Sequence, residues 1–142
     1  MPISLTYTWT ESQFQTGFVS AFPQFGTVSV GDALPYVPRH QGSARVTLDH
    51  PRARLGLAGT MRSGMLDAAG EWPTSVPDVP PLTQLDVALD VQATRWLGVY
   101  STMTNATAVS SVASWRPFGA RPVAPLQVMA GLRLRESARW ED

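Results

Sequence analysis

Apolar and polar side chains alternate along much of the chain. In residues 3–10, Ile3, Leu5, Tyr7 and Trp9 alternate with serine and threonine. Because successive side chains of a β-strand point to opposite faces, a period of two indicates a strand with one apolar and one polar face. The same pattern predicts strands in four further segments: 43–49, 53–62, 83–92 and 126–135.

A sixth segment, 96–105, has apolar side chains on both faces. Trp96 and Tyr100 fall on one side, and Leu97, Val99 and Met103 fall on the other. Its pattern therefore leaves open which face is buried. Two weaker candidates, 14–19 and 109–115, are expected to extend neighbouring strands. Twelve prolines and eleven glycines interrupt the chain too often for long helices. The fold class predicted is all-β and antiparallel, with about six to eight strands.

Charge is segregated between the two faces of the predicted strands. The apolar rows of the five clear segments carry no charged residue. The opposite rows carry these charged side chains: Arg45, Asp49, Arg54, Arg62, Asp86, Asp90, Arg133 and Arg135. An arginine at the bilayer midplane costs about 2–4 kcal/mol, so a lipid-facing wall requires such segregation. Each segment is about 8–11 residues long, which suits a tilted strand crossing the hydrocarbon of a bilayer.

The predicted connections alternate between long and short. The segments 11–41, 63–81 and 106–125 are long and rich in Pro, Gly, Ser and Thr, whereas His50-Pro51-Arg52 and Ala93-Thr94-Arg95 are tight. Membrane barrels have short periplasmic turns and longer extracellular loops, and every second connection lies on the same side. A half-buried sheet of a soluble β-sandwich shows the same alternation of side chains, but it has no reason to sort its loops by length.

The composition is unusual for a cytosolic protein. Charged residues make up 15% of the chain, against about 25% in soluble domains. The formal net charge is zero, so no overall field favours nucleic acid. The absence of cysteine excludes a disulfide framework, a thiolate zinc site and a cysteine nucleophile. Because no apolar run reaches eighteen residues, a membrane role would require strands.

Three stretches then resemble a known family. They are Gly31-Asp32-Ala33-Leu34-Pro35-Tyr36-Val37-Pro38-Arg39-His40, Leu97-Gly98-Val99-Tyr100-Ser101-Thr102-Met103-Thr104-Asn105, and Arg116-Pro117-Phe118-Gly119-Ala120-Arg121-Pro122-Val123-Ala124-Pro125. Their order and spacing resemble the C-terminal barrel portion of TonB-dependent receptors of the bacterial outer membrane, in particular those for ferric citrate and other ferric siderophores. Ala106 and Thr107 depart from the family's Leu-Phe after the asparagine, and Val123 and Leu126 stand where Gly and Arg are usual.

The resemblance implies an antiparallel transmembrane β-barrel segment in the cell outer membrane. Its expected role is to supply wall strands and extracellular loops for uptake of a ferric chelate. The implied partners are outer-membrane lipid, the chelate, the remaining barrel strands, a plug domain and, through that plug, TonB. Such barrels have about 22 strands. We therefore expect an incomplete barrel, with residues 1–135 as the barrel portion and 136–142 as a polar tail.

Two alternatives remain open. One is a small self-contained eight-stranded outer-membrane barrel with a structural or adhesive role, which needs both weak segments as true strands. The other is a soluble β-sandwich binding module.

No residue constellation points to catalysis. His40 and His50 are the only histidines, and Asp49 precedes His50, but neighbouring strand residues point to opposite faces. We expect His50 in a turn and His40 in a loop or at a strand edge. Phosphate-binding, dinucleotide-binding and nucleophile-elbow motifs are absent from the sequence. The prediction is a protein that is not an enzyme, with no catalytic residue, cofactor or metal site.

Arginines and aromatic residues are the remaining candidates. Arg39, Arg116 and Arg121 lie in the predicted outer loops, where they could attract an anionic ferric chelate; solvated loop arginines are the simpler interpretation. Trp9, Trp96, Trp115 and Tyr36 lie near strand ends, where membrane proteins place interfacial aromatics. Ordinary packing would explain them equally well. No residue is assigned to ligand contact.

Overall fold

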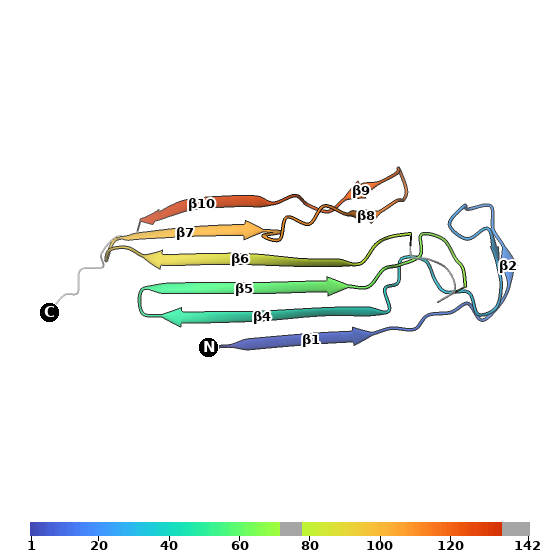
Figure 1. The fold of residues 1–142 in the computed structure, drawn as a ribbon, viewed down its shortest axis with the longest axis horizontal. Helices are drawn as coiled ribbons and strands as arrows, with labels where there is room; N and C mark the ends of the chain where they lie inside the picture. The colour runs from blue at the N-terminus through green and yellow to red at the C-terminus, as the bar shows by residue number, and fades with distance from the viewer. Residues whose placement is uncertain (72–77, 135–142) are drawn as a thin grey trace.

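One large antiparallel sheet dominates the structure (Figure 1). The computed structural model describes residues 1–71 and 78–134. Six strands pair in the order β1-β4-β5-β6-β7-β10. Their bounds are β1 (Ile3–Trp9), β4 (His40–His50), β5 (Ala53–Arg62), β6 (Leu82–Gln92), β7 (Leu97–Thr104) and β10 (Gln127–Leu134). The prediction of an all-β, antiparallel fold is confirmed. No helix among the described residues is long and apolar enough to cross a membrane.

The strands lie where alternation predicts them, with small differences at their ends. β5 has the predicted bounds, whereas β4 begins at His40, three residues before the predicted start. The reason is pairing with β1, because the ladder continues through Thr8↔Gln41 to Trp9↔His40. Arg135 of the predicted last strand and the predicted tail 136–142 lie outside the described residues.

Connections of different length gather at opposite ends of the sheet. Three long connections join the strands, at 10–39, at 63–71 with 78–81, and at 105–126; residues 72–77 lie outside the described part of the chain. The turns at 51–52 and 93–96 lie at the other end, together with the N-terminus (Figure 1). The predicted alternation of long and short connections is confirmed. We call these ends the loop end and the turn end.

Four very short strands pair within the loops. β2 (Phe18–Val19) pairs with β3 (Thr27–Val28), and β8 (Val112–Ser114) pairs with β9 (Arg121–Pro122). The weak segments 14–19 and 109–115 contain β2 and β8, so the expectation that they extend strands of the main sheet is wrong. In the first loop the cause is local packing. The rings of Phe14, Phe18 and Phe25 lie with centroids 5.4–6.2 Å apart, which draws this segment into its own aromatic cluster.

The strand register assembles the alternating rows into two continuous faces. We define the apolar face as the odd-numbered residues of β1, β5, β6 and β7 and the even-numbered residues of β4 and β10. Across it, Val46 pairs with Leu57 and Leu57 with Val87. This face carries no Asp, Glu, Lys or Arg in the six described strands. The remaining strand residues form the polar face, which holds all the charges of these strands.

Pairing with the neighbouring strands shows which side of the mixed segment 96–105 lies on the apolar face. Val99 pairs with Val91 on one side and with Leu132 on the other, so Leu97, Val99 and Met103 belong to the apolar face. Tyr100 therefore lies on the polar face. Sequence alone could not assign it, because β7 places an aromatic residue among polar ones.

Among the described residues, the buried apolar side chains lie in the loops and not in the six-stranded sheet. They are Val28, Met65, Leu66, Val79 and Val123. On the apolar face, by contrast, Leu5 is 79%, Leu132 69% and Leu134 73% exposed. Burying a leucine side chain would stabilise the protein by about 1.5–3 kcal/mol relative to leaving it exposed to water. The described part of the chain thus forms a single-layer sheet whose apolar face has no covering layer.

Candidate functional site

Three predicted candidates meet in one cluster at the loop end. Tyr36, Asp67, Trp115 and Arg116 come from three different loops, and we call them the loop hub. The Tyr36 hydroxyl donates to the Asp67 carboxylate and accepts the backbone N–H groups of Trp115 and Arg116, each at 3.2 Å. The Arg116 guanidinium binds the same carboxylate, with 2.9 Å between Nε and Oδ2. One phenol and one carboxylate therefore connect all three loops.

Further contacts and a strained backbone accompany the loop hub. Asp78 accepts the Trp115 indole N–H at 2.9 Å through its carbonyl oxygen. Its side chain accepts the Asp67 backbone N–H at 3.0 Å. Tyr36 has a φ of 59°, a left-handed conformation that costs a residue other than glycine about 1–3 kcal/mol. Its backbone N–H donates to Leu66 O at 2.9 Å. The surrounding contacts must offset that cost.

Burial raises the pKa of the Tyr36 phenol above its usual 10.0, and the hydrogen bond to Asp67 raises it further. Both causes favour the neutral phenol, which can donate to a carboxylate. The phenol consequently keeps its proton at physiological pH and remains a donor in the loop hub.

The three candidate arginines differ in their surroundings. Arg116 is engaged with Asp67, and Arg39 forms an ion pair with Glu11 at 3.4 Å between Nη2 and Oε1. Arg121 is exposed on β9 and has no ion pair with any described carboxylate. The structure thus gives Arg116 a role in joining loops, and it leaves Arg121 exposed to approaching anions.

The two histidines lie at opposite ends of β4. His40 begins the strand and its Nδ1 lies 2.8 Å from the Tyr7 hydroxyl, while His50 ends the strand and accepts the Arg52 N–H at 3.4 Å. His40 thus lies at a strand end, whereas His50, which was predicted in a turn, is the last residue of β4 because its pairing with Ala53 continues the ladder up to the turn. Asp49 binds Arg54 at 2.6 Å. Residues 1–71 and 78–134 contain no group of three or more potential metal ligands.

The four aromatic residues that were candidates for an interfacial belt lie in two kinds of surroundings. Trp9 ends β1 at the loop end and Trp96 precedes β7 at the turn end, and the two residues are 57% and 50% exposed. Trp9 belongs to the apolar face, as an interfacial belt requires, whereas alternation places Trp96 on the side of Tyr100, which is the polar face. Tyr36 and Trp115 belong instead to the loop hub.

Asn105 is a residue whose role sequence reasoning missed. It is fully buried and has a φ of 52°, a conformation that asparagine tolerates better than most residues. Its amide donates to Val109 O at 2.9 Å and to Ala124 O at 3.0 Å, and its side-chain oxygen accepts the Val109 N–H. It therefore joins the two arms of the third loop where β7 ends. The sequence contained one signal for this residue, because Asn105 ends the stretch 97–105 that resembles a strand of TonB-dependent receptors.

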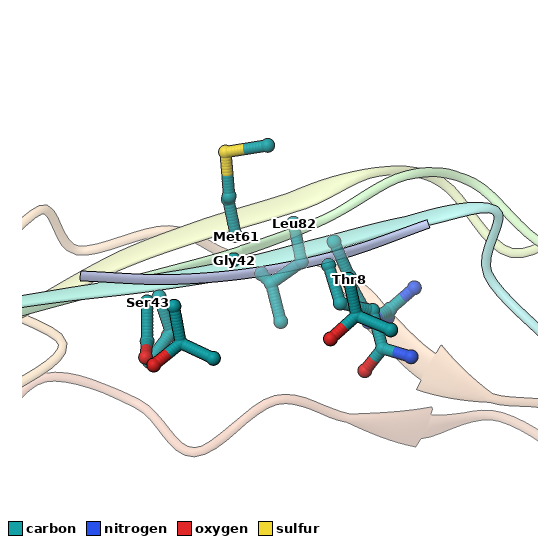
Figure 2. A pocket seen from close by; sticks show the side chains of 9 residues that line it. Thr8, Gly42, Ser43, Met61 and Leu82 are labelled. Carbon is teal, nitrogen blue, oxygen red and sulfur yellow. The ribbon is translucent and has the colours of Figure 1, made fainter. Parts of the chain in front are cut away.

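A shallow concavity lies on the polar face near the loop end. It has a volume of about 360 Å³, and its polar lining residues come from β1, β4 and β5. These lining residues are Thr6, Thr8, Gln41, Ser43, Thr60 and Arg62, and we call them the hydroxyl concavity. Figure 2 shows Thr8 and Ser43 on one side of the sheet and Met61 on the other.

Arg62 is the only charged residue among the described ones that line the concavity. Its Nη1 donates to Pro80 O at 3.2 Å, and its Nη2 is shielded from solvent without a hydrogen-bond acceptor. No described carboxylate forms an ion pair with it. This guanidinium therefore retains hydrogen-bonding capacity. Sequence reasoning counted Arg62 among the polar-row charges but could not see that no described acid pairs with it.

Comparison with models of known protein families found no match for this chain, and comparisons with curated proteins and with solved structures found none either.

Proposed function

We propose that the chain forms part of the wall of a transmembrane β-barrel in the bacterial outer membrane. A single observation carries the proposal, namely the apolar face that extends without a charge across six adjacent strands. Its exposed leucines and valines would be unfavourable in water. Acyl chains can cover such a face without any second protein layer, while water in the barrel interior solvates the charged polar face.

Strand length and loop sorting support the same role. β4, β5 and β6 have 10–11 residues, which suits tilted strands crossing a bilayer, whereas β1, β7 and β10 have 7–8 residues in the described part of the chain. The long loops lie at the loop end and the turns at the turn end. We assign the loop end to the outside, because outer-membrane barrels have their longer loops there.

The edges of the sheet imply partner strands. In the described residues β1 and β10 each pair on one side only. Unpaired backbone groups are not tolerated in hydrocarbon, so further strands must pair there. β1 runs toward the loop end and β10 away from it, which fits antiparallel neighbours on both sides (Figure 1). We propose that the remaining strands of a larger barrel fill these positions.

The parent molecule that the sequence suggests is a TonB-dependent receptor for a ferric chelate. In this proposal the chain contributes wall strands and outer loops, and it has no catalytic role. The plug domain and TonB would act through the rest of the receptor. Exposed Arg121 in the third loop could attract the anionic chelate. The three resembling stretches and the agreement of loop sorting with a barrel support this part.

Neither alternative has a supporting observation. A soluble β-sandwich would cover the apolar face with a second sheet, and the described residues supply none. An eight-stranded barrel would need 14–19 and 109–115 as wall strands. These segments contain strands of two and three residues that pair within loops.

The membrane role is tested by refolding the full chain with and without detergent. We expect a β-type circular dichroism spectrum and a monodisperse species only when detergent micelles are present. A monodisperse, β-rich chain in detergent-free buffer would contradict the proposal and support the soluble module.

The receptor role needs a separate test. Deleting the coding sequence should reduce uptake of radiolabelled ferric citrate by iron-starved cells of the source bacterium, and a plasmid copy should restore it. Unchanged uptake would contradict the ferric citrate assignment. A reading frame that continues upstream and encodes a plug would support the parent receptor.

A further inference from the structure

The two edges of the six-stranded sheet are open to a further strand. Among the described residues, β1 and β10 each pair on one side only. β1 is exposed along its whole length and contains neither a charged residue nor a proline. Natural sheets usually protect an edge with charges, prolines or bulges, so that other strands do not pair with it. The unprotected edge of β1 therefore favours pairing with another strand.

The outward backbone groups of both edges belong to residues of the apolar face. The Thr10 N–H donates to Arg39 O, and the Thr47 N–H donates to Pro2 O. Even-numbered residues of β1 therefore bond to β4, while its odd-numbered residues direct their N–H and C=O groups to the free edge. Carried through the strand register, the same alternation directs the even-numbered residues of β10 outward. The two edges can thus form a ladder that continues the apolar face.

The two edge strands are staggered along the strand direction. Successive partners across the sheet lead from Ile3 to Val128 through Val46, Leu57, Val87 and Met103. β10 continues for six residues beyond Val128, to Leu134. Figure 1 shows this offset, with β10 extending further than β1 toward the turn end. A stagger of this kind brings all the strands to the same depth in a membrane when they are tilted.

One register between two copies of the chain uses the whole of β1. If Ile3 of one copy lies opposite Leu134 of a second copy, every residue of β1 pairs with a residue of β10, including Leu5 with Leu132. The strands then shift by six residues over six strands. A shift of about 3.3 Å along each strand for about 4.8 Å across gives a tilt of about 35°, within the range of membrane barrels. A register shifted by two residues either way leaves an end of β1 without a partner in the described part of β10.

We propose that this chain, when no other receptor strands are supplied, pairs β1 of one copy with β10 of a second copy in this register. Pairing of this head-to-tail kind repeats until it closes a ring. Six strands are fewer than the roughly eight of the smallest membrane barrels, whereas two copies supply about twelve. In the ring the apolar face contacts lipid and the polar face lines a water-filled interior. The inference rests on the proposed role as barrel wall, because an edge requires a partner strand where hydrocarbon surrounds it.

The test introduces pairs of cysteines into the full chain, which has no cysteine of its own. For the chain refolded in detergent, we expect analytical ultracentrifugation to give a mass of at least two copies. Oxidation of the double variant Leu5→Cys/Leu132→Cys should give disulfide-linked dimers on a denaturing gel, because the Cα atoms of opposed strand residues lie about 5.5 Å apart. Each of the two single variants should remain monomeric on that gel.

The control for the register is the double variant Leu5→Cys/Val128→Cys. Its second cysteine lies four residues along β10 from Leu132, or about 13 Å from the position opposite Leu5. It should therefore form at least about tenfold less dimer than the first pair. A β-type circular dichroism spectrum in detergent verifies for each variant that the sheet has formed.

The inference is overturned by a β-rich monomer in detergent, by equal cross-linking of the two pairs, or by a disulfide formed within one copy. A monomer that needs detergent to fold would contradict the ring alone and leave the wall role standing. A chain that folds in detergent-free buffer would contradict the wall role and, with it, this inference.

Discussion

Gly131 and Tyr100 show how closely neighbouring residues on the polar face depend on one another. They are partners in the β7–β10 ladder. A Cβ on Gly131 would overlap the Tyr100 ring, so the ring occupies the space above the glycine. Arg133 lies with its guanidinium carbon 5.7 Å from the ring centroid and binds Asp90 at 3.0 Å. An aromatic ring over a glycine is a known means of pinning strand register.

Gly131→Ala should therefore destabilise the sheet by about 0.2–1 kcal/mol, because the new methyl group displaces the Tyr100 ring from its cross-strand position. The matched control is Gly56→Ala on the same face, where the new Cβ would meet Ala88 at an ordinary 3.8 Å. The midpoint of urea unfolding in detergent micelles measures both. Equal midpoints for the two variants would show that the ring does not pin this register.

Asn105→Ala should be the more damaging change at the loop end. It removes the acceptor of the Val109 N–H and leaves the carbonyl groups of Val109 and Ala124 without their donor. Leaving a buried polar group without its hydrogen-bond partner costs about 1–3 kcal/mol. We therefore expect the free energy of unfolding to fall by at least about 2 kcal/mol. Urea unfolding measures the loss. The control is Thr107→Ala, because that hydroxyl makes a single hydrogen bond, to Asn105 itself. A loss no larger than that of the control would contradict the structural role of Asn105.

At the scale of elements, alternation was sufficient to predict five of the six strands of the sheet. It worked because each strand has one apolar face, so the period of two is visible in the sequence. β7 was ambiguous because Tyr100 lies on the polar face, where its position over Gly131 depends on a different strand, β10. The prediction that segment 14–19 extends a strand of the main sheet was wrong, because its apolar residues pack against Phe25 within the loop.

The loops were less predictable than the strands. Tyr36 and Arg116 lie 31 and 49 residues from Asp67 along the chain, and local pattern carries no information about such contacts. The sequence indicated Tyr36 and Arg116 as candidates, but for belt and ligand roles. The sequence indicated Arg62 only as one of several charges on the polar rows. It could not show that no described acid pairs with Arg62, because ion pairing depends on which residues the strand register brings together.

Tyr36→Phe should loosen the three loops while leaving the sheet intact. The change removes the donor to Asp67 and the acceptor of two backbone N–H groups. Hydrogen exchange should therefore accelerate at Trp115 and Arg116 and stay unchanged in β5. Unchanged exchange at both loop amides would contradict the proposed role of the phenol.

The loop hub should also respond to alkaline pH. Because the folded-state pKa of Tyr36 lies above its unfolded value of 10.0, its contribution to stability is fully present below about pH 10 and is lost as pH rises through the folded pKa. Limited proteolysis of the loops should show faster cleavage above that pH in the wild type. Tyr36→Phe should lack this step, and a step of equal size in the variant would assign it to another group.

At the scale of the whole molecule, our proposal requires the apolar face to contact hydrocarbon. Val87 lies mid-strand on the apolar face between Leu57 and Met103, and Ala88 follows it on the polar face. Val87→Arg should reduce folded protein in detergent micelles, since an arginine at mid-depth costs about 2–4 kcal/mol. Ala88→Arg should be tolerated. Circular dichroism after refolding compares the two, and equal yields would contradict the assignment of the faces.

The most direct measurement exploits the absence of cysteine from the sequence. Single cysteines replacing Leu57 and Ala58, neighbours on opposite faces of β5, are labelled with a fluorophore in phospholipid micelles containing doxyl-labelled lipid. We predict strong quenching of the label at position 57 and weak quenching at position 58, with the reverse order for a water-soluble quencher. Equal quenching at both positions, or protection of position 57 from both quenchers, would contradict a lipid-facing sheet.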